Sequence, residues 1–134
     1  MNSDPKSELD WFQTLMALAR FLRTPEGCPW DRDQNSADFA KYTSNEVEEL
    51  KEALASGDNH HSEEEMGDVL FSLLATIAAA EEEGRFTLES TLVRIHEKMI
   101  RRHEHVFGDT KAETPEDAIR AWEKVKRREK EEKS

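Results

Sequence analysis

Carboxylates gather in the middle of this sequence at spacings that suit a metal ion. Nine acidic residues lie within residues 43–68 against a single lysine, and they carry most of the chain's formal net charge of −11. Glu46 and Glu49 are three residues apart, as are Glu65 and Asp68, so each pair points from one face of a helix. If the two helices pack antiparallel across the turn between them, all four carboxylates meet at one place.

Four carboxylates in one partly buried place repel one another unless protons or cations neutralise them. Hard divalent cations prefer oxygen ligands, and Mg²⁺ is typically held by a few carboxylates, its own waters and substrate phosphates. We therefore expect this quartet to bind Mg²⁺, for which Mn²⁺ can substitute. The alternative is a solvated acidic face paired with Lys and Arg from elsewhere. A di-iron site is disfavoured, because it needs a Glu three residues before a His, and none of the five histidines has one.

A stripe of basic residues further along the chain has the opposite sign. Its members recur at spacings of three and four: Arg94, Lys98, Arg101, Arg102 and His105. Beside an acidic metal pocket, such cations would clamp the phosphate oxygens that the metal leaves free. Pairing with glutamates of the same or a neighbouring helix is the alternative explanation. Trp30 and Trp122 are candidates for stacking on a base, although a single Trp is more often a core residue.

Apolar residues around these groups recur at helical spacing and predict an all-α protein. Five helices are expected, at about residues 8–23, from 43 or 44 to 56, 62–83, 88–106, and from 114 into the charged C-terminal residues. Two prolines and a glycine follow the first helix and leave a long loop over 24–39. Thr43 or Ser44 would cap the second helix, and Ser62 would open the third with a capping box.

The core that these helices can build is thin. Leu, Ile, Val and Phe make up roughly a fifth of the chain, whereas 37% of its 134 residues are charged. We expect one domain over residues 1–134, with a helical core at about 8–129 and a charged tail at 130–134. Because so few apolar side chains are available, the helical bundle is expected to complete its core against further copies of the chain, as a homo-oligomer.

Composition also bounds the compartment and the partners. Cys28 is the only cysteine, which excludes an intrachain disulfide and fits a reducing compartment. The first residues are polar rather than secretory, and the longest apolar stretch, at 66–80, falls short of the ~20 residues of a membrane helix. A cytoplasmic protein without a membrane partner is expected. The acidic excess argues against nucleic acid as a partner, and the basic residues at 124–130 fit a solvated helix end.

Several motifs together resemble the MazG-type nucleoside triphosphate pyrophosphohydrolases. The matching segments are residues 25–34 (PEGCPWDRDQ), 42–43 (YT), 46–49 (EVEE), 63–71 (EEEMGDVLF), 82–86 (EEGRF), 98–109 (KMIRRHEHVFGD) and 121–126 (AWEKVK). The likeness extends from about residue 9 to about residue 129 with all segments in the right order. It is therefore specific rather than a single short motif.

The resemblance implies an all-α, Mg²⁺-dependent enzyme that works as a homodimer or homotetramer. Such an enzyme cleaves a nucleoside triphosphate to the monophosphate and pyrophosphate, and a housekeeping role in cleansing the nucleotide pool would follow. The implied metal ligands are the quartet reached above from spacing: Glu46, Glu49, Glu65 and Asp68. The implied contacts to substrate are Lys98, Arg101 and Arg102 for the phosphates and Trp122 for the nucleotide.

One position departs from the family pattern. Asn45 stands where the family has the first Glu of its E-E-x-x-E motif, and an amide brings no charge to a metal and cannot act as a base. The alternative is therefore a MazG-like helical interaction module whose catalysis has weakened. For an active enzyme, Glu48 and Glu49 are the two candidates for taking the proton of the attacking water.

Overall fold

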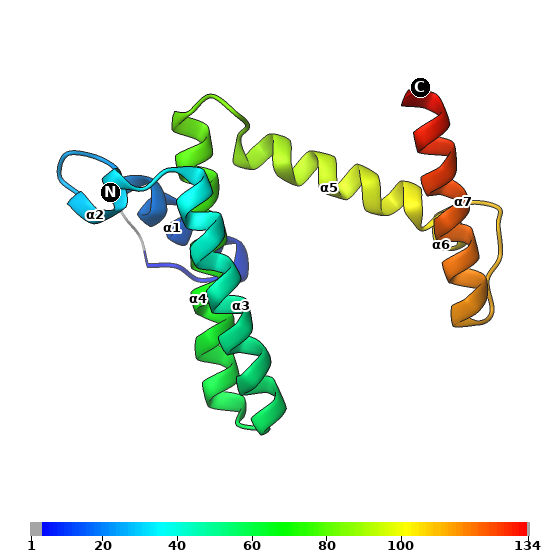
Figure 1. Cartoon of the computed structure of the whole chain (residues 1–134), viewed down its shortest axis with the longest axis horizontal. Helices are drawn as coiled ribbons and strands as arrows, with labels where there is room; N and C mark the ends of the chain where they lie inside the picture. Colours follow the sequence, from blue (N-terminus) through cyan, green and yellow to red (C-terminus); the bar gives the residue numbers. More distant parts are fainter. Residues whose placement is uncertain (1–3, 134) are drawn as a thin grey trace. The chain divides into compact units, whose positions relative to one another are not determined.

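The computed structural model describes residues 4–133, and every regular element within that range is a helix (Figure 1). The prediction of an all-α protein is confirmed. Contacts divide the chain into two compact units, Met1–Leu88 and Glu89–Ser134, which are described one after the other. A single domain over residues 1–134 stays a prediction. Among the described residues, no helix has both the length and the apolar character to cross a membrane.

Seven helices are present in the described part of the chain. Those of the first unit are α1 (Glu8–Phe21), α2 (Pro29–Asp33), α3 (Ser36–Ser56) and α4 (Asn59–Glu82). They are followed by α5 (Leu88–Arg102), α6 (Glu104–Phe107) and α7 (Pro115–Lys133). The five long helices are those that the sequence predicts. The short α2 lies in the predicted loop, α6 follows a break of the fourth predicted helix at His103, and α7 continues through residues 130–133 of the predicted tail.

The helix that carries Glu46 begins earlier than predicted. Asn35 caps α3, because its side chain accepts a hydrogen bond from the backbone N–H of Asp38 (2.8 Å) while Asp38 accepts one from Asn35 (2.9 Å). This reciprocal pair is a capping box. The prediction of a cap at Thr43 or Ser44 is therefore wrong, since Thr43 is buried inside the helix.

A tight turn joins α3 to α4. Gly57 ends α3 with a φ of +79°, which glycine adopts without steric cost. The next residue, Asp58, caps α4 by accepting a hydrogen bond from the His61 N–H at 3.1 Å, so the predicted cap at Ser62 is wrong. Because the turn is this short, the two helices lie side by side as an antiparallel pair (Figure 1).

The core of the first unit lies where α1 and α3 pack against α4. Met16 and Ala19 of α1 contact the buried Leu74 and Ala78 of α4. On the side of α3, the contacts are between one large residue and two small ones, Phe39, Ala75 and Ala79. The alanines allow the helices to approach closely. A buried hydrogen bond between the hydroxyls of Thr43 and Ser72 (2.9 Å) also joins α3 to α4.

Six apolar residues recur at helical spacing along α4 and predict one apolar stripe: Met66, Val69, Leu70, Leu73, Leu74 and Ile77. Only part of this stripe enters the core. Val69 and Leu74 are buried, but Met66, Leu70 and Leu73 are between 36% and 47% exposed. The apolar residues do recur at helical spacing, but the stripe that they form on α4 is wider than the surface that α1 and α3 cover. Apolar side chains on α4 are therefore left in contact with water.

In the second unit, α6 packs against α7 and an ionic contact joins α5 to α7. Glu129 accepts hydrogen bonds from Arg101 Nε (2.5 Å) and from Arg102 Nη2 (2.9 Å). Val125 of α7 is buried, whereas no residue of α5 is. The apolar side chains of α5 that are 45–48% exposed are Leu92, Val93 and Ile95.

Candidate metal centre

Three of the four predicted ligands meet where α3 lies against α4. Carboxylate oxygens of Glu46, Glu49 and Glu65, one from each residue, lie within 4.8 Å of one another. Glu46 and Glu49 stand on successive turns of α3, and Glu65 faces them from α4. The antiparallel pairing of the two helices thus gathers acidic groups that are remote in the sequence.

Two carboxylate oxygens of this cluster have no hydrogen-bond partner within residues 4–133. Glu46 is only 7% exposed and Glu65 is half-buried, and the Oε2 atom of each is buried without a hydrogen bond among the described residues. Leaving a buried carboxylate oxygen unpaired is costly. The other oxygen of Glu65 lies 3.3 Å from Nε2 of His61, which is half exposed. The two orphaned oxygens therefore fit a ligand that comes from outside the chain.

The donor set suits a hard divalent cation. It consists of carboxylate oxygens alone, and their mutual repulsion at this separation is what a doubly charged ion would neutralise. Asn45, the departure from the family motif, is exposed, and the cluster assembles without it. The residues present therefore fit Mg²⁺ or a similar ion.

Asp68 lies outside this group of three. Its charge and the charges of Glu46 and Glu49 nevertheless act on one hydroxyl, that of Tyr42. The pKa of the Tyr42 hydroxyl is raised above its usual value, first by a hydrogen bond with Glu46, then by burial and by the charges of Glu46, Asp68 and Glu49. A phenol that keeps its proton donates a hydrogen bond to a carboxylate. No spacing pattern in the sequence assigns a role to Tyr42. Its position one turn before Glu46 on the same helix is the signal that could have found it.

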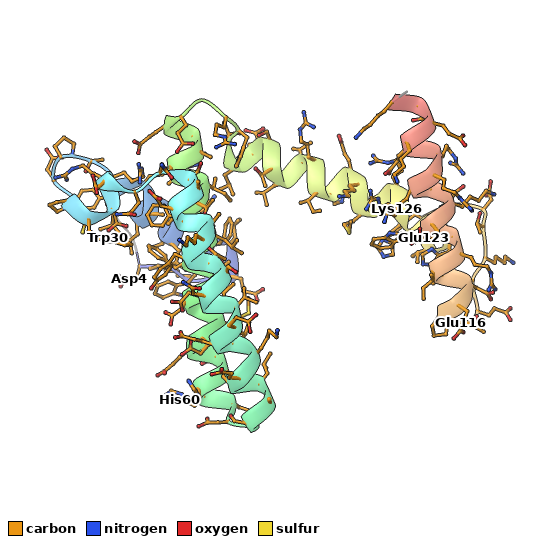
Figure 2. All side chains as sticks on the ribbon, viewed as in Figure 1. Asp4, Trp30, His60, Glu116, Glu123 and Lys126 are labelled. Carbon is orange, nitrogen blue, oxygen red and sulfur yellow. The ribbon has the colours of Figure 1, made fainter. Side chains whose placement is uncertain are left out.

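A cavity of about 260 Å³ is lined in part by Asp68 and Tyr42. Trp30 and Asp31 of α2 belong to the same lining, as does Phe39 of α3. The Trp30 ring packs edge-on against Phe39 and Tyr42, with ring centroids 5.9 and 6.4 Å apart. Figure 2 shows Trp30 on the short helix α2, beside α3. The predicted loop thus contributes an aromatic wall to a hollow beside the carboxylates.

Arg23 holds this loop in place. Its side chain is only 8% exposed and donates to the backbone oxygens of Asp31 (2.7 Å) and Gln34 (2.9 Å). The Nε atom lies 2.5 Å from a carboxylate oxygen of Glu82 at the end of α4. The role of Arg23 leaves no local pattern in the sequence, because its partners are two backbone carbonyls and a glutamate 59 residues away.

The predicted phosphate and nucleotide contacts belong to the second unit. Arg101 and Arg102 both bind Glu129, and these hydrogen bonds hold the pKa of that carboxyl at about 2, well below its usual value. The Arg102 guanidinium lies over the Trp122 ring, 5.8 Å from its centroid. Lys98 is half-buried on α5. The structure brings Arg102 and Trp122 together, and the contacts of all four residues with a substrate stay predictions.

The profile of the MazG nucleotide pyrophosphohydrolase domain matches residues 34–107, which are more than half of the chain and contain the carboxylate cluster. The chain belongs to this family. A crystal structure of a MazG-related protein from Thermotoga maritima superposes with a TM-score of 0.73 at 28% identity, covering 86% of this chain and 98% of that one. The helical arrangement described above is therefore that of a MazG-related fold.

Longer proteins contain a segment similar to this MazG domain. YabN of Bacillus subtilis is 42% identical over 89% of this chain and 24% of its own length. The nucleoside triphosphate pyrophosphohydrolase of Escherichia coli K12 is 39% identical, over 90% of this chain and 46% of its own length. The nucleoside triphosphate pyrophosphohydrolase/pyrophosphatase MazG of Thermotoga maritima is 40% identical, over 89% of this chain and 45% of its own length. The chain thus spans less than half the length of these curated relatives.

Proposed function

We propose that this MazG domain is a Mg²⁺-dependent nucleoside triphosphate pyrophosphohydrolase. It would convert a nucleoside triphosphate and water to the monophosphate and pyrophosphate, by breaking the bond between the α-phosphorus and its bridging oxygen. The observation that carries the proposal is the cluster of three carboxylates with two buried, unpartnered oxygens. The names of the relatives from Escherichia coli and Thermotoga maritima support the same activity.

Each acidic residue of the site has a proposed task. Glu46, Glu49 and Glu65 would hold the ion, and Asp68, one turn along α4 from Glu65, would complete its ligands. When bound, the ion would supply Lewis-acid chemistry, by shielding phosphate charge and lowering the pKa of a water. Tyr42, whose pKa is raised by Glu46, would orient that carboxylate by donating a hydrogen bond to it.

The contacts of Glu48 and Glu49 support a choice between the two candidate proton acceptors. Glu48 is exposed on α3 and pairs with Lys51 at 3.3 Å, so its carboxylate is engaged away from the cluster. Glu49 contributes an oxygen to the cluster itself. We therefore propose that Glu49 takes the proton of the attacking water through the carboxylate oxygen that does not hold the ion, because a water held at the cluster lies within its reach.

Basic residues of the second unit would take the phosphates. Arg101 and Arg102 are fixed by Glu129, which engages Nε of Arg101 and both Nε and Nη2 of Arg102. Since a guanidinium has five N–H donors, each side chain keeps donors for phosphate oxygens while its orientation is held. Lys98 would add a further charge, and Trp122 would contact the nucleotide.

The proposal extends to the setting of the enzyme. We expect a homodimer or homotetramer, because apolar side chains of α4 and α5 remain exposed in the single chain. A cytoplasmic location and a housekeeping role in clearing unwanted nucleotides from the pool fit the proposed reaction. Neither nucleic acid nor a membrane is expected as a partner.

Removing one carboxylate at a time tests the proposal. Glu49→Gln and Asp68→Asn keep the shape of each side chain and remove its charge. We expect either change to reduce Mg²⁺-dependent release of pyrophosphate to near background, measured by chromatography of monophosphate products from mixed nucleoside triphosphates. Circular dichroism should show unchanged helix content.

Glu52→Gln is the matched control, because Glu52 is an exposed glutamate of α3 outside the cluster. It should retain the turnover of the unaltered chain. Near-normal turnover in Glu49→Gln or Asp68→Asn would show that the assignment of the site is wrong. Absence of any hydrolysis by the unaltered chain would favour the interaction module instead.

A further inference from the structure

Two histidines lie side by side in the second unit. His103 directly precedes α6 and His105 lies within it, and their ring centroids are 5.4 Å apart with an angle of 40° between the ring planes. Both side chains are half-buried, and they line a cavity of about 280 Å³ together with Trp122 and Glu123 of α7. Figure 2 shows Glu123 on that helix. The cavity thus combines two imidazoles with one carboxylate.

The ring of His103 is held in one tautomer. Its Nδ1 atom lies 2.6 Å from the backbone oxygen of Met99. Because a carbonyl oxygen can only accept a hydrogen bond, Nδ1 must carry the proton, and in a neutral imidazole the other nitrogen, Nε2, then has a free lone pair. Histidines that bind metal ions are usually oriented in the same way, by a ring N–H that donates to a carbonyl or a carboxylate.

The ring of His105 has a nitrogen that the fold leaves without a partner. Its Nδ1 atom is buried and makes no hydrogen bond within residues 4–133, and it is the only buried side-chain nitrogen in that range of which this is true. A buried polar atom without a partner costs free energy. A ligand from outside the chain that binds this nitrogen would remove the cost.

The donor set selects a different kind of cation from the carboxylate cluster. Imidazole nitrogen is a good ligand for Zn²⁺, Ni²⁺ and Cu²⁺, whereas Mg²⁺ takes oxygen ligands. At Zn–N distances of ~2.0–2.1 Å, two imidazoles on one tetrahedral ion have ring centroids roughly 5 Å apart. The separation of 5.4 Å between His103 and His105 is close to this value. Glu123 brings a negative charge to the same lining, which favours a cation.

The positive charge beside this cavity is balanced within the fold. The Arg102 guanidinium lies over the Trp122 ring, 5.8 Å from its centroid. The same guanidinium forms an ion pair with Glu129 at 2.9 Å, in which both side chains are 16% exposed. A charge that is neutralised at this distance opposes a second cation much less than a free one would.

We propose that His103 and His105 form a second metal site, which binds Zn²⁺ or a similar borderline cation through Nε2 of His103 and Nδ1 of His105. Water would take the other positions of the ion, since within residues 4–133 no group of three ligating side chains gathered within 4.8 Å includes these histidines. The site goes beyond the proposed function, because it needs neither a nucleotide nor an ion at the carboxylate cluster.

The fluorescence of Trp122 can report an ion at this site. The ring of His103 packs edge-on against Trp122 with ring centroids 5.2 Å apart. Trp11→Phe combined with Trp30→Phe leaves Trp122 as the only tryptophan of the chain. Ni²⁺, which is paramagnetic, should quench its emission with saturation at one ion per chain. An excess of Zn²⁺ or the chelator EDTA should restore the emission, and Mg²⁺ alone should not change it.

Substitutions in this single-tryptophan chain assign the ion to its ligands. His103→Gln and His105→Gln each remove one ligand and should weaken the binding of Ni²⁺ about tenfold or more. His96→Gln is the matched control, because His96 is an exposed histidine of α5 that does not line the cavity. Glu49→Gln alters the carboxylate cluster and should leave the quenching unchanged. Circular dichroism checks that each variant keeps its helix content.

The outcomes separate the second metal site from the proposed enzyme. Quenching that both histidine variants weaken and Glu49→Gln does not would support the site, whether or not the chain hydrolyses nucleoside triphosphates. The absence of saturable quenching in the single-tryptophan chain would overturn the inference and leave the proposed enzyme untouched. Quenching that neither histidine variant weakens would place the ion elsewhere, and it would overturn the inference as well.

Discussion

Glu46 connects the chemistry of the site to the fold. Its carboxylate is buried and raises the pKa of the Tyr42 hydroxyl, and its Oε2 atom has no hydrogen-bond partner among the described residues. The pairs at spacing three are visible in the sequence and predict that all four carboxylates meet. Within the described residues, the structure gathers oxygens of Glu46, Glu49 and Glu65, without Asp68. Tyr42 is on the same helix and was equally visible, but its importance depends on burial, which a spacing rule does not report.

Glu129 gives a test at the scale of one residue. Its pKa of about 2 results from the hydrogen bonds of Arg102 and Arg101. A carboxylate with a lowered pKa in the folded state stabilises the fold fully above about pH 4.5, its unfolded value, and loses this effect as the pH falls toward 2. We expect the thermal midpoint of the unaltered chain, followed by circular dichroism, to fall more steeply over this range than that of Glu129→Gln.

A neighbouring glutamate serves as the control for this pH effect. Glu132 is exposed on the same helix, so Glu132→Gln should follow the pH profile of the unaltered chain. Parallel profiles for the unaltered chain and Glu129→Gln would contradict the ionic link between α5 and α7.

At the scale of elements, two arginines near the end of α1 make matched contacts with α4. Arg20 pairs with Glu81 and its side chain is 49% exposed, whereas Arg23 pairs with Glu82 and is 8% exposed. Exposed pairs contribute about 0–1 kcal/mol. Arg23 also supplies charged donors to two backbone carbonyls, and such bonds contribute about 1.5–3 kcal/mol each.

We therefore expect Arg23→Gln to lower the free energy of unfolding by at least about 2 kcal/mol, and Arg20→Gln by less than about 1 kcal/mol. Urea denaturation measures both values. Hydrogen exchange in residues 29–34 should become faster in Arg23→Gln alone. Equal losses, or exchange that does not change, would show that Arg23 does not hold the loop.

The ends of the helices were the least predictable feature at this scale. Asn35 and Asp38 form a capping box, and α3 begins at Ser36, seven or eight residues before the expected start at 43 or 44. Thr43 and Ser44 were expected as caps because they are chemically suitable and lie closer to the apolar pattern. Thr43 instead lies inside the helix, and its hydroxyl donates a hydrogen bond to the hydroxyl of Ser72 on α4. Whether a threonine caps its own helix or donates a hydrogen bond to a neighbouring helix depends on which groups the neighbouring helix places beside it.

At the scale of the whole molecule, the amount of uncovered apolar surface predicts self-association. Leu92 and Ile95 of α5 are 47% and 45% exposed, on a helix with no buried residue. We expect sedimentation to give a mass of two or four times 15.5 kDa, because a charged chain with a thin core gains stability by covering these side chains.

Leu92→Glu should lower the sedimentation mass and make thermal unfolding occur at a lower temperature. Glu97→Gln, on the opposite side of the same helix by its spacing from Leu92, should change neither. A mass of 15.5 kDa for the unaltered chain at micromolar concentration would contradict the oligomer.

The sequence by itself determined the all-helical fold, the five long helices and the acidic residues of the site, because helical periodicity and charge spacing are local properties of the chain. Only the tertiary structure decided that Glu46, Glu49 and Glu65 converge while Asp68 borders a cavity, and that Arg23 binds the loop that carries Trp30. These outcomes depend on how tightly α3 turns into α4 and on bonds between residues remote in sequence. Such distances follow from packing, which no local pattern encodes.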